Sequence, residues 1–583
     1  RIGGQKLLEI LTRITQGAGK VEDLAMIEDI AGVMKEGSLC ALGQGTPNPV
    51  LTALKYFRYE FEAHIIDKRC PAGVCTTFAP SPCRSGCPAE VNIPEYLSLI
   101  ADGKYDEALA VHRQSNPFPS VCGRVCPAFC EDKCRRGEVD DPVAVRDLKR
   151  FMADHESATW TPEQLEPDKG ESVAIIGGGP GGLTAALRLA QFGYRCTVYE
   201  ALPKLGGMMR YGIPDYRLPK SVLDDEISSI LRIGKIEVKT NTALGKDVAL
   251  SGVLKEHAAV LLAIGAQGSH RLDIPGEELE GVVHGVELLQ RLNSGEDMSF
   301  VKGKRVAVVG GGNVAMDAAR SLLRLGAAEV HVVYRRERRD MPALTEEIEA
   351  AEEEGIHFHL ATRRWRRRMI SAEEERAKFH FLAAPTEILG AEGKVTGIKC
   401  QRLSLTDAHG KAEFDSSARK RPVPVEGSYF TLHVDMIVPA VGQTIDMPLL
   451  REEGINQNRD GTISVQRRTF LTSREGVFAI GDAVIGPASV VEAVSQGNKV
   501  AKAIHRYLRG MDPLEPAQFL DRPEPRRYEL SEEDAERPRA KTNILAPEVR
   551  VCDFREVDLG YPTPEVAHRE ARRCLRCDLE TRE

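Results

Sequence analysis

The chain has 583 residues, a length that accommodates about four domains at roughly 150 residues each. It carries 78 basic and 86 acidic residues, and the net charge of −8 argues against general nucleic-acid binding, which requires a basic footprint. No apolar run approaches the ~18 residues of a membrane span and no signal peptide is recognisable, so we expect a cytoplasmic protein without a direct membrane span.

Residues 1–62 are predicted to be helical, because apolar residues recur at helical spacing over 7–14 and 24–34. Two glycines and two prolines between residues 43 and 49 predict a turn, and a further helix should follow over about 50–61. The segment therefore indicates a small helical domain at the start of the chain.

The fourteen cysteines are distributed unevenly. Eight lie between residues 70 and 134, whereas the long stretch from 135 to 551 holds only two, Cys196 and Cys400, which we expect on buried strands. Disulfide scaffolds are short and rich in cysteine throughout. Clustering in a long chain instead favours metal ligation in a reducing compartment.

Six of these cysteines form two closely spaced motifs, C-x3-C-P and C-x3-C-P-x2-C-x3-C. A spacing of four can place cysteines on one helical stripe, but Gly123 and Pro127 disfavour a continuous helix, so we expect loops. Thiolate quartets at short spacing are what [4Fe–4S] clusters require. Six ligands are two short of two clusters, and the tail offers two more. The eight cysteines are Cys83, Cys87, Cys122, Cys126, Cys130, Cys134, Cys574 and Cys577.

Residues 171–200 are predicted to form a strand, a glycine turn, a helix and a second strand. In the motif G-x-G-x-x-G, Gly177 allows the tight turn, Gly179 lets the backbone approach a pyrophosphate, and Gly182 lets helix and strand pack closely. The free N–H groups of the helix N-terminus favour an anion there. Glu200 ends the second strand and is placed to bond a ribose hydroxyl, so the segment predicts a dinucleotide site.

Residues 304–334 repeat this unit, with an alanine in place of the third glycine. The second strand ends in Arg335 and Arg336 instead of an acid. Arginines can clamp a 2′-phosphate, which favours NADP(H) over NAD(H); the alternative is a solvated surface pair. The nucleotide-binding residues of this turn are expected to be Gly310, Gly312, Asn313 and Ala315.

A run of arginines at residues 363–368 could suggest nucleic-acid binding. It is interpreted as a solvated loop or a partner contact, because the run is short and the chain is acidic.

A third signature, Gly481-Asp482, follows an apolar strand and precedes a helix predicted over about 490–508. At this point the sequence resembles the two-dinucleotide flavoprotein reductases, in which this aspartate bonds the ribityl chain of FAD. The segments 263–265 and 440–442 resemble their crossovers between domains. The resemblance implies an FAD domain split by an inserted NADP domain. Residues 201–300 contain no cysteine, so a thiol-disulfide reductase with a redox-active pair near the flavin is not expected.

The cysteine motifs, the segment 206–214 and Tyr334-Arg-Arg resemble the glutamate synthase small chain and its relatives, including half of dihydropyrimidine dehydrogenase, over about residues 80–510. The resemblance implies bound FAD, with Gly207 and Gly265 among its contacts, besides NADP(H). Members usually carry C-x2-C before the first matched cysteine, and here the tail resembles that element moved to the C-terminus.

By carry-over from this family, one [4Fe–4S] cluster is assigned to Cys83, Cys134, Cys574 and Cys577. The other is assigned to Cys87, Cys122, Cys126 and Cys130. The alternative is that the two tail cysteines are incidental.

The segments 38–43 and 57–65 resemble the cluster domain that ends the NADH-binding flavoprotein subunit of respiratory complex I, which also occurs in electron-bifurcating hydrogenases. On this resemblance Cys40 is the fourth ligand of a further [4Fe–4S] cluster. The three partner cysteines are absent from this chain, and a buried structural role for Cys40 is the alternative.

Four potential metal ligands belong to none of the motifs above: His64, Cys70, Cys75 and Cys552. Three or four nitrogen and sulfur ligands can hold a structural Zn²⁺. The segment 64–75 also resembles the hinge of bifurcating hydrogenase subunits. The alternative is that these are ordinary structural residues.

The expected fold is α/β, with two Rossmann-like domains preceded by helical iron–sulfur domains. The expected activity is electron transfer between NADP(H), FAD, the clusters and a partner, which is a complex I-like, formate dehydrogenase-like or hydrogenase-like iron–sulfur subunit, or ferredoxin. Electron bifurcation is compatible with this plan. The alternatives are a glutamate synthase small subunit and a non-enzymatic cluster scaffold. The expected domains are 1–66 (complex I-like), 67–165 (two clusters), 166–290 with 445–510 (FAD), 291–444 (NADP) and 511–583 (linker and cysteine-bearing tail).

Overall fold

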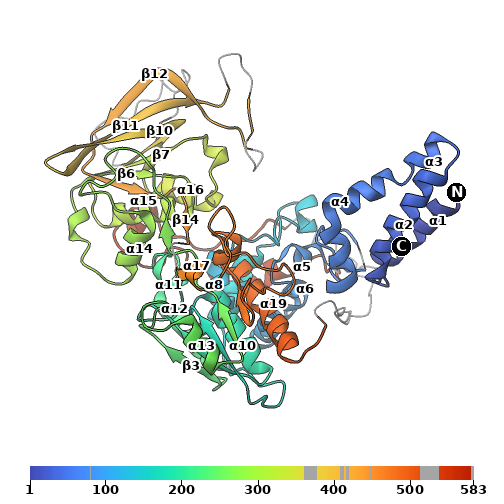
Figure 1. The fold of residues 1–583 in the computed structure, drawn as a ribbon. Helices are drawn as coiled ribbons and strands as arrows, with labels where there is room; N and C mark the ends of the chain where they lie inside the picture. Colours follow the sequence, from blue (N-terminus) through green and yellow to red (C-terminus); the bar gives the residue numbers. More distant parts are fainter. Residues whose placement is uncertain are drawn as a thin grey trace. The chain divides into compact units, whose positions relative to one another are not determined.

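The structure is a computed structural model that describes residues 1–75, 77–78, 81–359, 377–406, 412–414, 419–445, 449–512 and 537–579. The basic run at 363–368 and most of the predicted linker lie outside these residues. The chain divides into two compact units, one formed by 1–160, 501–542 and 561–583 and the other by 161–500 and 543–560 (Figure 1). Within the described ranges, no helix has both the length and the apolar character to cross a membrane.

The first unit begins with the predicted helices. They are α1 (Ile2–Thr15), α2 (Glu22–Gly37), α3 (Ala41–Gly45), α4 (Asn48–Glu62) and a π-helical turn, η1 (Ala63–Asp67). Their buried apolar residues form one core that includes Leu7, Ile27 and Ile65. The predicted turn over 43–49 is wrong in part: its glycines lie inside α3, and Pro49 lies in the first turn of α4, where its missing N–H costs nothing.

The rest of the first unit is made of short helices joined by loops. They are α5 (Pro82–Gly86), α6 (Ile93–Ala101), α7 (Tyr105–Arg113), α8 (Pro119–Val125), η2 (Arg135–Glu138), α9 (Val145–Asp154) and, from the tail, α21 (Pro564–Ala571). The expectation of loops at the cysteines is wrong for Cys83, on α5, and for Cys122, on α8. Gly123 does not break α8; it lets α8 approach α9, because a Cβ there would lie 2.6 Å from Arg150 Cα.

The tail is fixed to this unit by the buried carboxylate of Glu570. Its Oε1 accepts from the backbone N–H of Ala144 at 2.9 Å, and its Oε2 accepts from that of Ala540 at 2.7 Å. Arg573 donates to Glu570 at 2.7 Å and to Asp140 at 2.8 Å. These bonds hold the end of α21 beside the loop that follows η2.

The second unit contains two parallel sheets. The first has the order β15-β4-β1-β2-β3, formed by β1 (Ser172–Ile176), β2 (Arg195–Tyr199), β3 (Ile236–Lys239), β4 (Ala259–Leu262) and β15 (Val477–Ala479). Its central strands read as continuous apolar runs because helices cover both faces of such a sheet. The helices of this part are α10 (Pro180–Gln191), α11 (Met208–Tyr211), α12 (Lys220–Leu231), α13 (Leu250–Glu256), α17 (Leu449–Glu452) and α18 (Asp482–Ile485), and α19 (Val490–Leu508) begins in it.

The second parallel sheet has the order β13-β6-β7-β9-β8, from β6 (Arg305–Val309), β7 (Glu329–Tyr334), β8 (Ile356–His359), β9 (Ala377–Phe381) and β13 (Met436–Pro439). An antiparallel sheet of β10 (Ala383–Ala391), β11 (Lys394–Ser404) and β12 (Val423–Leu432) packs beside it (Figure 1). The remaining helices are α14 (Gly285–Asn293), η3 (Ser299–Val301), α15 (Asn313–Arg324), η4 (Arg338–Asp340), α16 (Thr345–Glu353) and α20 (Pro547–Arg550). The strand–turn–helix–strand predictions for 171–200 and 304–334 are therefore confirmed.

The chain leaves the first sheet after β4 and returns before β15, so the second sheet is an insertion. The two crossings pair with each other as β5 (Gly268–Ser269) and β14 (Gln443–Thr444), which run antiparallel. Cys196 and Cys400 are buried on β2 and β11, as predicted.

We predict that Gly123→Ala destabilises the first unit by about 1–3 kcal/mol, because the added methyl overpacks the contact between α8 and α9. Denaturant unfolding followed by circular dichroism measures the change. The matched control is Gly32→Ala in α2, where a Cβ meets nothing within 4 Å and the substitution should stabilise by about 0.5–1 kcal/mol. Equal unfolding of the two variants would contradict the packing role of Gly123.

Candidate functional site

The first glycine turn is shaped so that only glycine fits at two of its positions. Gly177 has φ +110°, and a Cβ there would collide with the carbonyl oxygen of Ala263. A Cβ on Gly182 would collide with the carbonyl oxygen of Gly177. The face of Gly179 is open, since its nearest neighbour would be Gly207 Cα at 3.8 Å. This open face at the start of α10 fits a diphosphate.

Glu200 is held against this turn. Its Oε2 accepts from the backbone N–H of Gly178 at 2.8 Å, and its Oε1 accepts from that of Leu202 at 2.9 Å. Burial raises the pKa of Glu200 despite these bonds. The carboxylate is thus fixed directly after β2, where the sequence predicts a ribose ligand.

The other predicted FAD residues follow neighbouring strands of the same sheet. Gly265, with φ +67°, follows β4, and Gly481, with φ +74°, follows β15. Asp482 starts α18; its Oδ1 accepts from the N–H of Ala488 at 3.2 Å, and burial raises the pKa of Asp482 to about 6. The carboxyl ends of β15, β4, β1 and β2 are adjacent, which is where ligands bind in open α/β sheets. The two carboxylates and the open glycine turn at this edge of the sheet fit a bound FAD.

The second glycine turn has the same construction. A Cβ on Gly310, at φ +148°, would collide with the carbonyl oxygen of Ala440, whereas Gly312 has an open face. Asn313 begins α15 and accepts from the N–H of Leu344 at 3.0 Å. Ala315 is fully buried, as a small residue at the third position must be.

The two arginines that follow β7 differ in their surroundings. Arg335 is exposed, whereas Arg336 is buried and donates from Nε to the carbonyl oxygen of Lys420 at 3.1 Å. Both line a cavity of about 380 Å³ together with Arg421 and Phe414. The alternative of a solvated pair therefore does not describe Arg336. A cavity lined by three guanidinium groups fits a phosphate.

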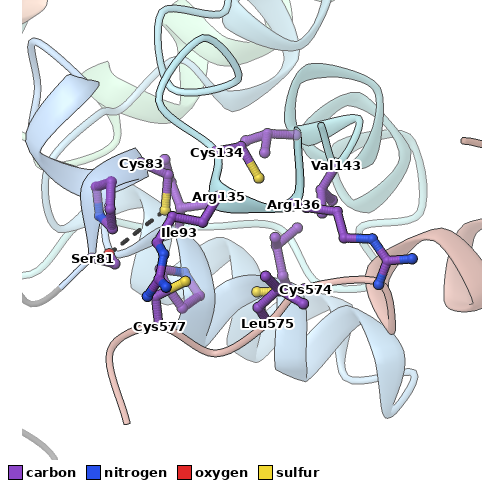
Figure 2. Close-up of a pocket in the computed structure, with 14 residues that line it drawn as sticks. Ser81, Cys83, Ile93, Cys134, Arg135, Arg136, Val143, Cys574, Leu575 and Cys577 are labelled. Atoms are coloured by element: carbon purple, nitrogen blue, oxygen red, sulfur yellow. Dashed lines mark hydrogen bonds between the residues drawn. The ribbon is translucent and has the colours of Figure 1, made fainter. Parts of the chain in front are cut away.

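Four cysteines from three distant segments line one cavity in the first unit (Figure 2). Cys83 lies on α5, Cys134 precedes η2, and Cys574 and Cys577 follow α21. Burial raises the pKa of Cys574 to about 12, and it raises the pKa of Cys83 well above its ordinary value. Such thiols ionise only beside a cation, so the donor set fits a metal cluster.

The second predicted quartet lies in the first unit around Lys149 of α9, and its four cysteines are buried, whereas those of the first quartet are half-buried. Lys149 is 6% exposed, and its ammonium donates to the carbonyl oxygen of Cys122 at 3.4 Å. Burial opposes the charge, but the attraction of the four nearby sulfurs outweighs it and raises the pKa of Lys149. A buried ammonium that faces four sulfurs fits an anionic thiolate cluster. The four are Cys87, Cys122, Cys126 and Cys130.

Asn116 adds a polar contact to this quartet, since its Nδ2 donates to Cys122 Sγ at 3.3 Å. Neither Asn116 nor Lys149 was found from the sequence. Lys149 lies 27 residues after Cys122 in the chain, and only the packing of α8 on α9 brings it to the sulfurs. Asn116 lies six residues before Cys122, but no recognisable motif marks it.

His64, Cys70 and Cys75 form a tight group, with their ligand atoms all within 4.8 Å of one another. His64 Nε2 lies 3.3 Å from Cys75 Sγ, while Nδ1 lies 2.7 Å from the carbonyl oxygen of Glu60. Burial and the neighbouring Cys70 raise the pKa of Cys75 to about 11. Cys552 is not part of this group; it is an exposed residue of the second unit whose thiol donates to the carbonyl oxygen of Glu548 at 3.1 Å.

Cys40 is exposed, which contradicts the alternative of a buried structural residue. Its sulfur accepts from the N–H of Gly43 at 3.4 Å and caps α3. The exposed position leaves the sulfur accessible to a further ligand.

Three segments of the chain match described families. Residues 171–497 match the pyridine nucleotide-disulphide oxidoreductases. The chain belongs to this family. Residues 57–160 match the 4Fe-4S cluster domain II of dihydropyrimidine dehydrogenase, and residues 1–64 match the iron-sulfur binding region of NADH-ubiquinone oxidoreductase-F. The resemblances to flavoprotein reductases, to dihydropyrimidine dehydrogenase and to the complex I flavoprotein subunit are thereby confirmed.

Several relatives of this pyridine nucleotide oxidoreductase are named beta subunits or small chains. It is 38% identical to the NADP(+)-dependent formate dehydrogenase subunit beta of Moorella thermoacetica, over 99% of this chain and 87% of the relative. It is 36% identical to the NADPH-Fe(3+) oxidoreductase subunit beta of Geobacter sulfurreducens, with the same coverage. It is 33% identical to the glutamate synthase [NADPH] small chain of Azospirillum brasilense, over 77% of this chain and 91% of that one.

The solved structure of FprA from Mycobacterium tuberculosis has the same fold, with a TM-score of 0.50 and 22% identity over 60% of this chain and 87% of that chain. The predicted fold class, with Rossmann-type domains and a helical iron–sulfur region, is confirmed. The chain is an NAD(P)H-dependent flavin iron–sulfur oxidoreductase subunit.

Proposed function

We propose that this subunit passes electrons between NADP(H) and a partner redox subunit through FAD and two [4Fe–4S] clusters. The observation that carries the proposal is the pair of cysteine quartets in the first unit, one buried and one half-buried. The family is named for disulphide chemistry, yet the segment 201–300 contains no cysteine. Electrons therefore leave through the quartets instead of a thiol pair.

Bound FAD supplies the conversion between hydride transfer and single-electron transfer. The protein would orient it, since Gly179 has an open face for the diphosphate, Glu200 is fixed where it would bond the ribose, and Asp482 is placed to bond the ribityl chain. The residues proposed to complete the FAD site are Gly177, Gly182, Gly207, Gly265 and Gly481. Hydride transfer requires no acid or base from the protein, so no catalytic side chain is assigned.

NADP(H) is proposed to bind the second turn, through Gly310, Gly312, Asn313 and Ala315, with Arg335 and Arg336 on the 2′-phosphate. The cavity that both arginines line supports this assignment. The proposed domain limits remain 1–66, 67–165, 166–290 with 445–510, 291–444 and 511–583.

The partner is proposed to be a formate dehydrogenase-like, hydrogenase-like or complex I-like iron–sulfur subunit, or ferredoxin. The relatives that span 99% of the chain are named as formate dehydrogenase and Fe(3+) oxidoreductase subunits. The glutamate synthase relative spans only 77% of it, which disfavours a role as a glutamate synthase small subunit. Two intact glycine turns disfavour a non-enzymatic scaffold. Thiolate clusters suit a reducing cytoplasm.

We also propose that His64, Cys70 and Cys75 bind Zn²⁺, with water in the fourth position. Ligating histidines usually donate their other ring N–H to a carbonyl oxygen, and Nδ1 of His64 lies 2.7 Å from such an oxygen. Cys40 is proposed as a ligand of a third cluster that a further segment or partner completes.

Arg335→Ala should raise KM for NADPH about 10- to 100-fold and leave KM for NADH unchanged, because a charge-assisted bond to the 2′-phosphate contributes about 1.5–3 kcal/mol. Steady-state kinetics with each nucleotide measures this. The control is Arg338→Ala, whose guanidinium already pairs with Glu352 at 2.8 and 3.0 Å. A parallel rise for NADPH in both variants would refute the specificity of Arg335.

Cys577→Ser should lose about four irons per chain and one EPR signal while the second cluster remains, because serine replaces a thiolate of one quartet only. Iron analysis and EPR of the dithionite-reduced protein measure the loss. The control Cys552→Ser should keep all iron. Loss of both clusters, with the fold intact by circular dichroism, would contradict two separate quartets.

Cys75→Ser should lower the zinc content from about one ion per chain towards zero, because the three-ligand site loses a thiolate. Elemental analysis of the anaerobically purified protein measures it. Cys552→Ser should retain the zinc. Wild-type protein that contains no zinc, even after incubation with Zn²⁺, rules the site out.

A further inference from the structure

The two quartets differ in the charges around them. At the quartet that contains Cys122, the buried ammonium of Lys149 makes its hydrogen bond to a carbonyl oxygen, and no carboxylate of the described residues forms an ion pair with it. The neighbouring arginines are all paired with acids: Arg113 with Glu156, Arg146 with Asp147, and Arg150 with Asp154. Lys149 is therefore an uncompensated positive charge in a low-dielectric site.

The amide of Asn116 is oriented towards the same sulfur. Its Oδ1 accepts from the backbone N–H of Phe118 at 2.9 Å, so the amide can present only Nδ2 to Cys122 Sγ, at 3.3 Å. His112 adds no charge here, because burial and the nearby Lys149 lower its pKa well below the ordinary value. Among the described residues, the quartet thus has the buried ammonium of Lys149 and a side-chain N–H···S hydrogen bond from Asn116, besides backbone hydrogen bonds to Cys87.

Two cations at the other quartet are paired with nearby acids. Arg136, which lines the cavity, pairs with Asp140 at 2.6 Å. Arg576, between the two tail cysteines, pairs with Asp578 at 3.0 Å. Arg135 also lines this cavity, but it is partly exposed, so water screens its charge. These cations therefore contribute a weaker field at their sulfurs than Lys149 contributes at its own quartet.

We propose that Lys149 and Asn116 make the cluster held by Cys87, Cys122, Cys126 and Cys130 the more easily reduced of the two. The inference rests on the proposed function, since it presumes both clusters. Reduction adds one negative charge to a cluster, and a buried cation stabilises that charge more than it stabilises the oxidised form. Hydrogen bonds to cluster sulfurs act in the same direction.

Electrons that enter the subunit then collect on this cluster, and the cluster of the tail cysteines holds them less strongly. Lys149 contacts no substrate or reacting atom. It is therefore a positioning residue, which acts on the cluster through the electrostatic field of its ammonium. The order in which the two clusters are reduced is thus set by Lys149 on α9 and by Asn116 in the segment that precedes α8.

The test is an anaerobic, EPR-monitored redox titration of the holoprotein. The signal that survives in Cys577→Ser identifies the cluster near Lys149, and it should have the higher midpoint potential in the wild type. Lys149→Met should shift the oxidised-to-reduced ratio of this cluster at least tenfold towards the oxidised form, which is about 59 mV for one electron. The other signal should not move.

Two controls separate charge from packing. Lys149→Arg keeps the charge and should retain the high potential. Lys133→Met removes an equal charge from an exposed side chain beside Cys134 and should change neither signal, because water screens it.

If Lys149→Met loses its cluster, Asn116→Asp is used instead. This variant keeps the oxygen that accepts from Phe118 and replaces the N–H donor to Cys122 by a negative charge. It should lower the same midpoint. Unchanged midpoints in iron-replete variants, or a lower potential for the surviving cluster in Cys577→Ser, overturn the inference. Wild-type protein without cluster signals instead refutes the proposed function.

Discussion

The buried carboxylate of Glu570 is the interaction on which the iron–sulfur region depends. It joins the tail to the rest of the first unit by accepting from Ala144 and Ala540 and by pairing with Arg573. The buried carboxylate of Glu570 is stable because these three partners compensate its charge. Removal of one of the partners would leave that charge only partly compensated, which destabilises the fold. The quartet completed by Cys574 and Cys577 exists only because this network returns the end of the chain to α5 and η2.

A comparable network fixes the second unit. Arg217, in the loop after α11, donates to Asp317 of α15 at 2.8 and 3.0 Å and to Glu347 of α16 at 2.8 Å. All three side chains are nearly buried. The loop that follows the segment 206–214 is thereby tied to the helix that begins at the second glycine turn. Electron transfer between bound nucleotide and flavin requires such fixed orientation.

The sequence predicts the parts of the fold that depend on local chemistry. The glycine turns are recognisable because their backbone excludes side chains at Gly177 and Gly310, and the first helices are recognisable from their apolar period. Gly123 was misinterpreted as a helix breaker, because the close approach of α9 is a tertiary constraint. The roles of Lys149 and Glu570 are not predictable locally, because their partners Cys122 and Ala144 are distant in sequence. Asn116 is near Cys122 in sequence, but no motif marks it as a donor to the sulfur.

The charge pattern connects structure and activity in this subunit. Two glycine turns have open faces that fit anions, and two quartets of cysteines fit metal clusters, with a different balance of charge at each. The chemistry of NADP(H), FAD and clusters is the cofactors' own, and the protein contributes position and field.

The most direct test of this account is an anaerobic titration of the FAD- and iron-replete protein with NADPH and, separately, with NADH, followed by flavin absorbance and by EPR. The account predicts that NADPH bleaches the flavin and reduces a cluster at far lower concentration than NADH does. Flavin and clusters that stay oxidised with both nucleotides would contradict it.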